Sequence, residues 1–148
     1  MTTQPIRPPT LTPRLIIEDA ARAIDVYQRV FEAVELERYT TKQGRLVHAA
    51  LRIGDAVVAL VDAAPDEHNH APGQLGGTPV LLQLRVDDPD LIQQRMVAAG
   101  GTVIYPVADQ YYGQRGGRVA DPYGHVWMIF KEIETLDPAE IQRRTTES

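Results

Sequence analysis

The stretch DPYGHVWMIF, residues 121–130, predicts a tight turn that leads directly into a buried strand. Its proline fixes the backbone angle φ, Gly124 accepts a positive φ, and the side chain of Asp121 can bond to its own backbone, as turns require. Residues 126–130 form a continuous apolar run with β-branched and aromatic side chains. The run is too short for a helix and is typical of a strand covered on both faces. We expect this strand to be the last of the fold.

A second hairpin signal and two helix signals lie upstream of this stretch. Gly54 and Asp55 separate two apolar runs, which predicts another hairpin. Asp19 and Asp88 each precede a segment with apolar residues at helical spacing, so each is a candidate N-terminal cap. The strands expected from these patterns are residues 15–17, 34–39, 46–53, 56–61, 80–86, 102–105, 117–120 and 126–131, and the helices are residues 20–33, 89–99 and 138–144.

These predicted elements repeat along the chain. Each half has the order β-α-β-β-β, and the spacing from helix cap to hairpin glycine differs by only one residue between the halves. We therefore predict an α+β fold built from two βαβββ modules. The expected boundaries are a flexible N-terminal arm at residues 1–10, a first module at 11–62, a mobile connecting loop at 63–78, a second module at 79–133, and a C-terminal helix and tail at 134–148.

Composition indicates an ordinary globular protein. The 148 residues are 43% hydrophobic and 24% charged, enough for a core in one domain or in two small repeats. The net charge of −5, with scattered Arg and Lys, gives no basic field for nucleic acid or an anionic membrane. The absence of cysteine excludes disulfides, a thiolate nucleophile and a Cys-based zinc site. Residues 1–9 lack the apolar core of a signal peptide and no apolar run has the length of a membrane span, so we expect a cytoplasmic protein.

The tandem βαβββ order resembles the vicinal oxygen chelate superfamily, which includes glyoxalase I, extradiol dioxygenases, fosfomycin-resistance enzymes and bleomycin-resistance proteins. The helix AIDVYQRVF at 23–31 and the hairpins LRIGD at 51–55 and DPYGH at 121–125 carry the resemblance. Residues 103–112 and 137–144 resemble the PhnB-like branch in particular. The resemblance implies a U-shaped, partly closed mixed sheet with helices outside and a cavity inside. It also implies a homodimer, in some members with exchanged modules.

The resemblance further implies where a catalytic metal would be held. In the metal-using members, each module contributes one ligand from the strand before its helix and one from the strand after its hairpin glycine. The corresponding positions here are Thr12, Val58, Leu81 and Met128. Three of these side chains are apolar and threonine is a poor ligand, so they do not form a site for a hard divalent ion. We expect no metal and no cofactor.

Histidines at other positions could supply metal ligands instead. His48 lies within a predicted strand and corresponds to Arg118 by the repeat offset, and a structural, hydrogen-bonded role is the alternative. His68 and His70 lie with neighbouring acids in the connecting loop, where a solvated loop that binds metal only weakly is the alternative. His125 is expected to be a turn residue or the first residue of the following strand.

Side-chain alternation predicts which residues line the cavity. If Leu81 and Met128 face it, a period of two adds Gln83 and Arg85 and turns Trp127 toward the helix. An inward charge needs a ligand, a partner or water, so a salt bridge at the rim is the alternative for Arg85. Tyrosines in a glycine-flanked loop could form a lid, or could instead pack on the sheet edge. The predicted ligand-binding residues are His48, Gln83, Arg85, Tyr105, Tyr111, Tyr112, Arg118 and Met128, and no catalytic residue is assigned.

These patterns suggest three functions. The first is a metal-free protein of the bleomycin-resistance type that sequesters an aromatic or amphipathic small molecule in a cavity associated with a homodimer. The second is a metal-dependent lyase, isomerase or dioxygenase of the same superfamily, and the third is an accessory dimer whose own side chains fill the cavity. We take the first as the main hypothesis, because the expected metal positions lack donors. We expect no nucleic-acid or membrane partner.

Overall fold

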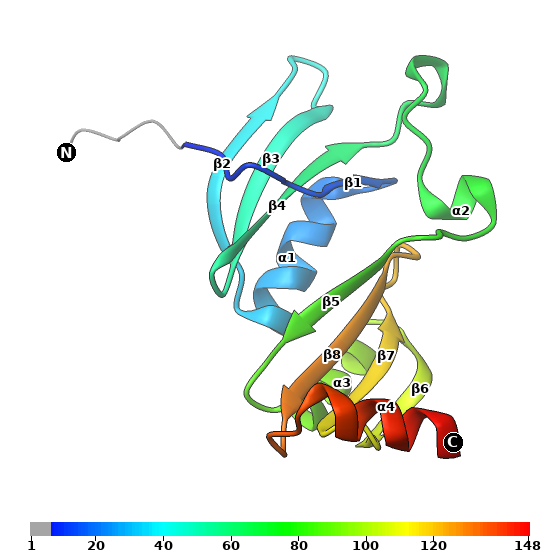
Figure 1. Ribbon diagram of the computed structural model, residues 1–148. Coiled ribbons are helices and arrows are strands. Elements are labelled where there is room, and N and C mark those ends of the chain that lie inside the picture. The colour runs from blue at the N-terminus through cyan, green and yellow to red at the C-terminus, as the bar shows by residue number, and fades with distance from the viewer. Residues whose placement is uncertain (1–6) are drawn as a thin grey trace. The chain divides into compact units, whose positions relative to one another are not determined.

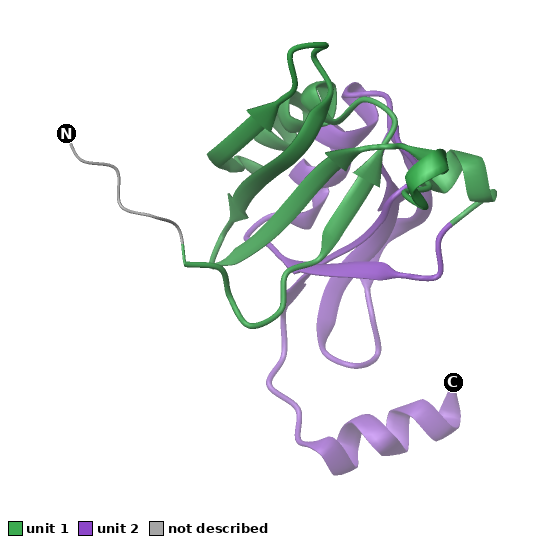
Figure 2. Ribbon diagram, turned by 90° about the horizontal axis from the view of Figure 1, so that it is seen from above, with its two compact units in different colours: residues 1–77 green, residues 78–148 purple. Residues whose placement is uncertain are grey.

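The computed structural model describes residues 7–148 and divides the chain into two compact units, the first ending at Gly77 and the second beginning at Thr78 (Figure 2). Each unit has a four-stranded mixed sheet and helices, which confirms the predicted α+β class and the βαβββ repeat (Figure 1). Residues 1–6 of the expected N-terminal arm (1–10) lie outside the described residues. Within the described part of the chain, no helix is long and apolar enough to cross a membrane.

The first unit orders its strands β1-β4-β3-β2, with β1 parallel to β4 and the other pairs antiparallel. Helix α1 packs against β1, β3 and β4 with one apolar face. The Asp62 carboxylate accepts hydrogen bonds from the backbone N–H of Ala20 and of Leu46, both at 2.8 Å, and so joins the start of α1 to the start of β3. The elements are β1 (Arg14–Ile17), α1 (Ala20–Phe31), β2 (Val34–Thr40), β3 (Leu46–Ile53), β4 (Ala56–Asp62), η1 (Pro65–Glu67) and α2 (Pro72–Leu75).

The second unit repeats this arrangement with the order β5-β8-β7-β6. Helix α3 packs against β6, β7 and β8. Trp127 and Ile129 are buried at 2% and 0% exposure and lie on the helix-covered face, as alternation predicted. The elements are β5 (Leu81–Arg85), α3 (Pro89–Ala98), β6 (Thr102–Asp109), β7 (Gln114–Ala120), β8 (Val126–Glu132) and α4 (Pro138–Glu147).

The turn at residues 121–125 is organised by the buried carboxylate of Asp121, which is 4% exposed. Its Oδ1 accepts hydrogen bonds from the backbone N–H of Tyr123 at 2.9 Å and of His125 at 3.0 Å. Its Oδ2 accepts from the indole Nε1–H of Trp127 at 3.0 Å. The predicted bond from Asp121 to its own turn is confirmed, and the same carboxylate also fixes the aromatic side chain at the centre of the core.

Strand β6 extends further than the sequence predicted. Residues 106–109 continue the strand, where a loop was expected, because a β-bulge accommodates the proline. The register shifts between Tyr105 and Ala108, and the free N–H of Val107 is satisfied by Oε1 of Gln93 on α3 at 2.8 Å. Two smaller corrections concern the ends of elements: α4 runs beyond residue 144 to Glu147, and the segment 63–78 contains the short helices η1 and α2.

The register within each unit corrects the expected match between the modules. Arg14 and Gln83 are equivalent residues, because each lies five positions before the helix cap of its unit. Arg14 pairs with Ala59, and Gln83 pairs with Met128. The counterpart of Met128 is therefore Ala59, not Val58. The offset was wrong because Ala59 lies three residues after Ala56, the first paired residue of β4, whereas Met128 lies only two residues after Val126, the first paired residue of β8.

The same correction applies to His48, which was matched to Arg118. Ala50 pairs with Ala59, and Arg118 pairs with Met128, so Ala50 is the counterpart of Arg118. His48 lies two residues earlier on β3.

Candidate functional site

A row of four side chains crosses the open face of the second sheet. Gln83 pairs with Met128, Met128 with Arg118, and Arg118 with Tyr105, so one residue comes from each strand. Directly paired residues project to the same face of a sheet. Because Trp127 and its neighbours fill the opposite face beneath α3, this row lies on the face that the helix leaves uncovered.

The row borders a hollow of about 340 Å³ that is formed entirely by the second unit. This volume falls at the lower end of the range for small-molecule sites, about 300–1,000 Å³. Its lining combines aromatic and apolar surface with amide groups and a single charge. The lining residues are Gln83, Tyr105, Pro106, Gln110, Tyr112, Gln114, Gly116, Gly117, Arg118, Met128, Ile129 and Phe130.

Two adjacent glycines on β7 make room for the hollow. Gly116 lies between Phe130 and Ala108 in the next row of the sheet, and it contributes no side chain to the floor. A Cβ atom on Gly117 would lie 2.7 Å from the carbonyl oxygen of Tyr105 and 2.8 Å from the nitrogen of Val107. The bulge of β6 therefore closes onto Gly117 at a distance that only glycine allows.

Arg118 carries the charge of the hollow. Its guanidinium lies over the Tyr105 ring, 5.1 Å from the ring centre, in a cation–π contact. Its Nη2 approaches Sδ of Met128 at 4.0 Å, which is a weak hydrogen bond at most. The Nε atom is buried and has no hydrogen-bond partner among residues 7–148. The protein thus positions this cation by packing and leaves its donors largely unsatisfied.

Tyr112 forms a wall of the hollow within the turn that joins β6 to β7. The backbone N–H of Gln110 donates to the carbonyl of Gln114 at 2.7 Å, and the carbonyl of Gly113 accepts from Ile133 at 2.9 Å. The rings of Tyr111 and Tyr112 meet edge to face, with centres 5.1 Å apart. The wall is therefore a short, hydrogen-bonded turn rather than the long lid that the sequence suggested.

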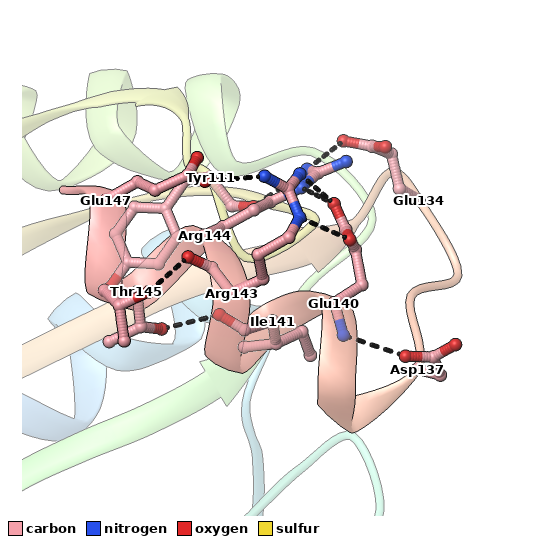
Figure 3. A network of polar contacts seen from close by, with 10 residues as sticks. Tyr111, Glu134, Asp137, Glu140, Ile141, Arg143, Arg144, Thr145 and Glu147 are labelled. Atoms are coloured by element: carbon pink, nitrogen blue, oxygen red, sulfur yellow. Dashed lines mark hydrogen bonds and ion pairs between the residues drawn. The ribbon is translucent and has the colours of Figure 1, made fainter.

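Helix α4 holds this turn through Arg144 (Figure 3). The Nη1 group of Arg144 donates to the carbonyl oxygen of Tyr111 at 2.9 Å, and its Nε donates to Glu140 at 2.9 Å. Glu140 also accepts from Arg143 at 2.6 Å. No residue of α4 is fully buried, so these polar contacts are the main link between the helix and the tyrosine turn.

A family model described as the Glyoxalase/Bleomycin resistance protein/Dioxygenase superfamily matches residues 10–129. The chain belongs to this superfamily. An uncharacterized protein of Mycobacterium bovis is 44% identical over 137 residues, which cover 90% of this chain and 90% of that protein. An uncharacterized protein of Mycobacterium tuberculosis shows the same identity over 137 residues and is covered to 81%.

Solved structures of the superfamily share the fold. TioX from Micromonospora sp. ML1 is 27% identical with a TM-score of 0.64, over 87% of this chain and 100% of that chain. The fosfomycin resistance protein FosX from Mesorhizobium loti is 18% identical with a TM-score of 0.61, over 95% of this chain and 99% of that chain. A PhnB protein from Bacillus cereus is 16% identical with a TM-score of 0.63, over 83% of this chain and 99% of that chain. The last two similarities support the fold alone, so the PhnB-like branch stays a prediction.

The metal positions of the superfamily do not fit a metal in this chain. With the corrected register they are Thr12, Ala59, Leu81 and Met128. The Thr12 hydroxyl is buried and unpartnered, but one hydroxyl and one thioether do not make a site for a hard divalent ion. Over residues 7–148, no group of three His, Asp or Glu side chains is placed to hold a metal.

Five of the eight residues predicted to bind a ligand line the hollow: Gln83, Tyr105, Tyr112, Arg118 and Met128. The other three do not. Tyr111 packs against Tyr112 and is 41% exposed, Arg85 is exposed on β5, and His48 belongs to the first unit. The predicted set did not contain the other seven lining residues, among them Gln110, Gln114 and Gly116. Extending β7 to its true start would have found the last two, since they alternate with Arg118.

His48 is part of a polar network on the first sheet. Arg14 donates to its Nδ1 at 3.0 Å, so its Nε2–H donates to Glu37 at 2.9 Å. Tyr39 donates to the other oxygen of Glu37 at 2.9 Å. The hydrogen bonds from His48 and Tyr39 hold the pKa of Glu37 below its ordinary value. These contacts correspond to the structural role that the sequence left open.

Acidification is expected to release α4 from the tyrosine turn. The hydrogen bonds from Arg143 and Arg144 lower the pKa of Glu140 from 4.5 to about 2. Because this pKa is depressed in the folded state, the contribution is complete above about pH 4.5 and is lost as the pH falls toward 2. The ion pairs are solvent-exposed, so the effect should be local rather than global.

The release can be followed by the amide signals of α4 and of Tyr111 during an NMR titration from neutral to acidic pH. Glu140→Gln should show the released signals already at neutral pH, and Glu147→Gln, which removes only an outer partner of Arg143, should behave like the wild type. Unchanged α4 signals down to pH 2 would contradict the assignment.

Proposed function

We propose that the protein is a metal-independent small-molecule binding protein whose ligand occupies the hollow of the second unit. The observation that carries this proposal is the lining itself: Tyr105, Tyr112 and Phe130 offer aromatic surface, Met128 offers adaptable apolar contact, and Arg118 offers one charged anchor. An aromatic or amphipathic compound matches this combination. Function as a binding protein is also consistent with a superfamily that includes resistance proteins as well as enzymes.

The chemistry of the lining favours binding over catalysis. The lining residues include no His, Asp, Glu, Lys, Ser or Cys, so the phenols of Tyr105 and Tyr112 are the only lining side chains of a kind that serves as nucleophile or general base. The two other hypotheses gain no such support, because the metal positions lack donors and the hollow is not filled by its own side chains. The homodimer and the cytoplasmic location expected from the sequence remain part of the proposal.

Filling the hollow tests the proposal. Met128 is one of the two inner residues of the row, so Met128→Trp should occupy the space of the ligand. For an aromatic compound that raises the melting temperature of the wild type, we expect affinity to fall by at least about tenfold, or about 1.4 kcal/mol. Isothermal titration calorimetry with bicyclic aromatic compounds measures this.

Val97→Trp is the matched control, because Val97 is 49% exposed on α3 and does not line the hollow. It should bind like the wild type. Equal binding by Met128→Trp and the wild type would place the compound elsewhere. A panel in which no aromatic compound binds the wild type would contradict the proposal as a whole.

A further inference from the structure

The lining of the hollow has an unbalanced charge. Among its twelve residues Arg118 is the only ionisable cation or anion at neutral pH, and the remaining polar groups are neutral amides and phenols. A small cavity that contains one guanidinium and no carboxylate presents a net positive charge to a ligand.

The arginines of the second unit differ sharply in their partners. Arg115, three residues earlier on β7, forms 2.9 Å ion pairs with Asp90 and with Asp109. Arg144 pairs with Glu140 at 2.9 Å. Arg118 has no carboxylate partner among residues 7–148, and it contacts only the Tyr105 ring and the Met128 sulfur. Arg118 is therefore a cation that the protein has positioned without neutralising.

The unsatisfied donors of Arg118 define what could complete the site. Its Nε is buried without an acceptor, and such a donor costs about 1–3 kcal/mol while it stays unpaired. Because Nε is closed to a ligand, a carboxylate in the hollow would accept from the two Nη groups instead, since the planar guanidinium binds such anions with two parallel hydrogen bonds. A neutral ligand would form weaker hydrogen bonds with these donors because they would lack the assistance of a negative charge, and a cationic ligand would be repelled.

We propose that the hollow selects an anionic aromatic compound, an aryl carboxylate or a group of the same shape and charge. Its anionic group pairs with Arg118, and its ring lies against Tyr112 and Phe130. The side chain of Tyr105 holds the guanidinium from the other side through the cation–π contact. This inference rests on the proposed function, since it names the ligand class of the same site.

Three probes with one ring system test the selectivity: 2-naphthoate, 2-naphthamide and 2-naphthylmethylammonium. Titration calorimetry at low and at physiological salt should show that the wild type binds the naphthoate at least about tenfold more tightly than the amide, and the ammonium most weakly. The preference for the naphthoate should decrease with salt, although less than for a fully exposed ion pair.

Substitution at Arg118 separates the charge from the cavity. Arg118→Gln should lose the preference for 2-naphthoate over 2-naphthamide while its affinity for the amide stays within about twofold of the wild type. Arg118→Lys should retain part of the preference for 2-naphthoate, because lysine keeps the positive charge but lacks the planar guanidinium that forms two parallel hydrogen bonds. Arg85→Gln is the matched control, because it removes the same charge from an exposed residue of the same sheet that does not line the hollow, and it should bind all three probes like the wild type.

The possible failures are distinguishable. Equal affinity for the three probes, or a naphthoate preference that survives Arg118→Gln or disappears in Arg85→Gln, would overturn the assignment of Arg118 while leaving the hollow as a binding site. Absence of binding by all three probes would overturn this inference together with the proposed function.

Discussion

Replacement of Asp121 by alanine is expected to lower the free energy of unfolding by about 3–4 kcal/mol, because several donors lose one shared acceptor. The backbone N–H groups of Tyr123 and His125 can be rehydrated at the surface of the turn. The indole N–H of Trp127 cannot, since that side chain is 2% exposed. Chemical denaturation monitored by the fluorescence of Trp127, the single tryptophan of the chain, measures the change directly.

Two further variants separate the roles of the carboxylate. Asp121→Asn keeps one oxygen that can accept hydrogen bonds, but its amide NH2 group would face an N–H group that now donates to the carboxylate. We expect this variant to lose about half of the unfolding free energy that Asp121→Ala loses. Asp88→Ala removes a single exposed capping bond, from the Leu91 N–H at 3.1 Å, and should cost about 1 kcal/mol. If Asp121→Ala were no more destabilising than Asp88→Ala, the turn would not depend on this carboxylate.

Replacement of Gly117 by alanine is expected to destabilise the protein by about 2–3 kcal/mol and to weaken ligand binding in the hollow. The new methyl group would lie within 3.0 Å of backbone atoms of Tyr105, Pro106 and Val107. Backbone cannot move aside as a flexible side chain can, so the bulge of β6 must shift. This shift would displace Tyr105 and with it the guanidinium of Arg118.

Gly73→Ala is the control for this substitution. A Cβ atom on Gly73 would meet only the far end of the Glu18 side chain, at 3.3 Å, and the residue has a negative φ within α2. Its stability should be unchanged or slightly increased, by about 0.5 kcal/mol, since alanine reduces the entropy of the unfolded chain. Melting temperatures and naphthoate titrations of both variants test the pair. A Gly117→Ala variant as stable as Gly73→Ala would mean that the bulge is not closely packed.

Much of the fold could be predicted because its determinants are local in the sequence. The caps Asp19 and Asp88 both accept the expected backbone hydrogen bonds, from Arg22 and Leu91, and the two helices begin directly after them. The apolar run at residues 126–130 became β8 as predicted, but α3 covers only one of its faces, whereas cover on both faces was expected. Capping and alternation act within a few residues, so a single sequence reveals them.

The errors came from features that depend on contacts distant in the sequence. Pro106 suggests the end of a strand, but the bulge and the side chain of Gln93 on α3 allow β6 to continue. The pairing of β4 with β1 and of β8 with β5 shifts the match of Val58 by one residue, which a cap-to-glycine spacing cannot detect. In both cases pairing between strands overrides the local signal.

In the candidate site, too, features set by local sequence could be predicted, and features set by contacts distant in the sequence could not. Alternation along β5 and β8 correctly grouped Gln83 and Met128 on one face, and Arg118, which the sequence only suggested as an addition to that surface, pairs with Met128. The role of Arg144 could not be predicted, because its contact with the carbonyl of Tyr111 spans 33 residues and depends on where α4 lies. The sequence also could not show that Arg118 lacks a carboxylate partner in the part of the chain that the structure describes, whereas Arg115 has two.

The central claim is that the hollow of the second unit binds its ligand without a metal. The most direct test is calorimetric titration of 2-naphthoate into protein stripped of metals by a chelator, compared with the same protein after addition of zinc, manganese or nickel. We predict the same affinity in all samples, and its loss in Met128→Trp. Binding that appears only after metal is added, together with tight uptake of one metal ion per chain, would contradict the account.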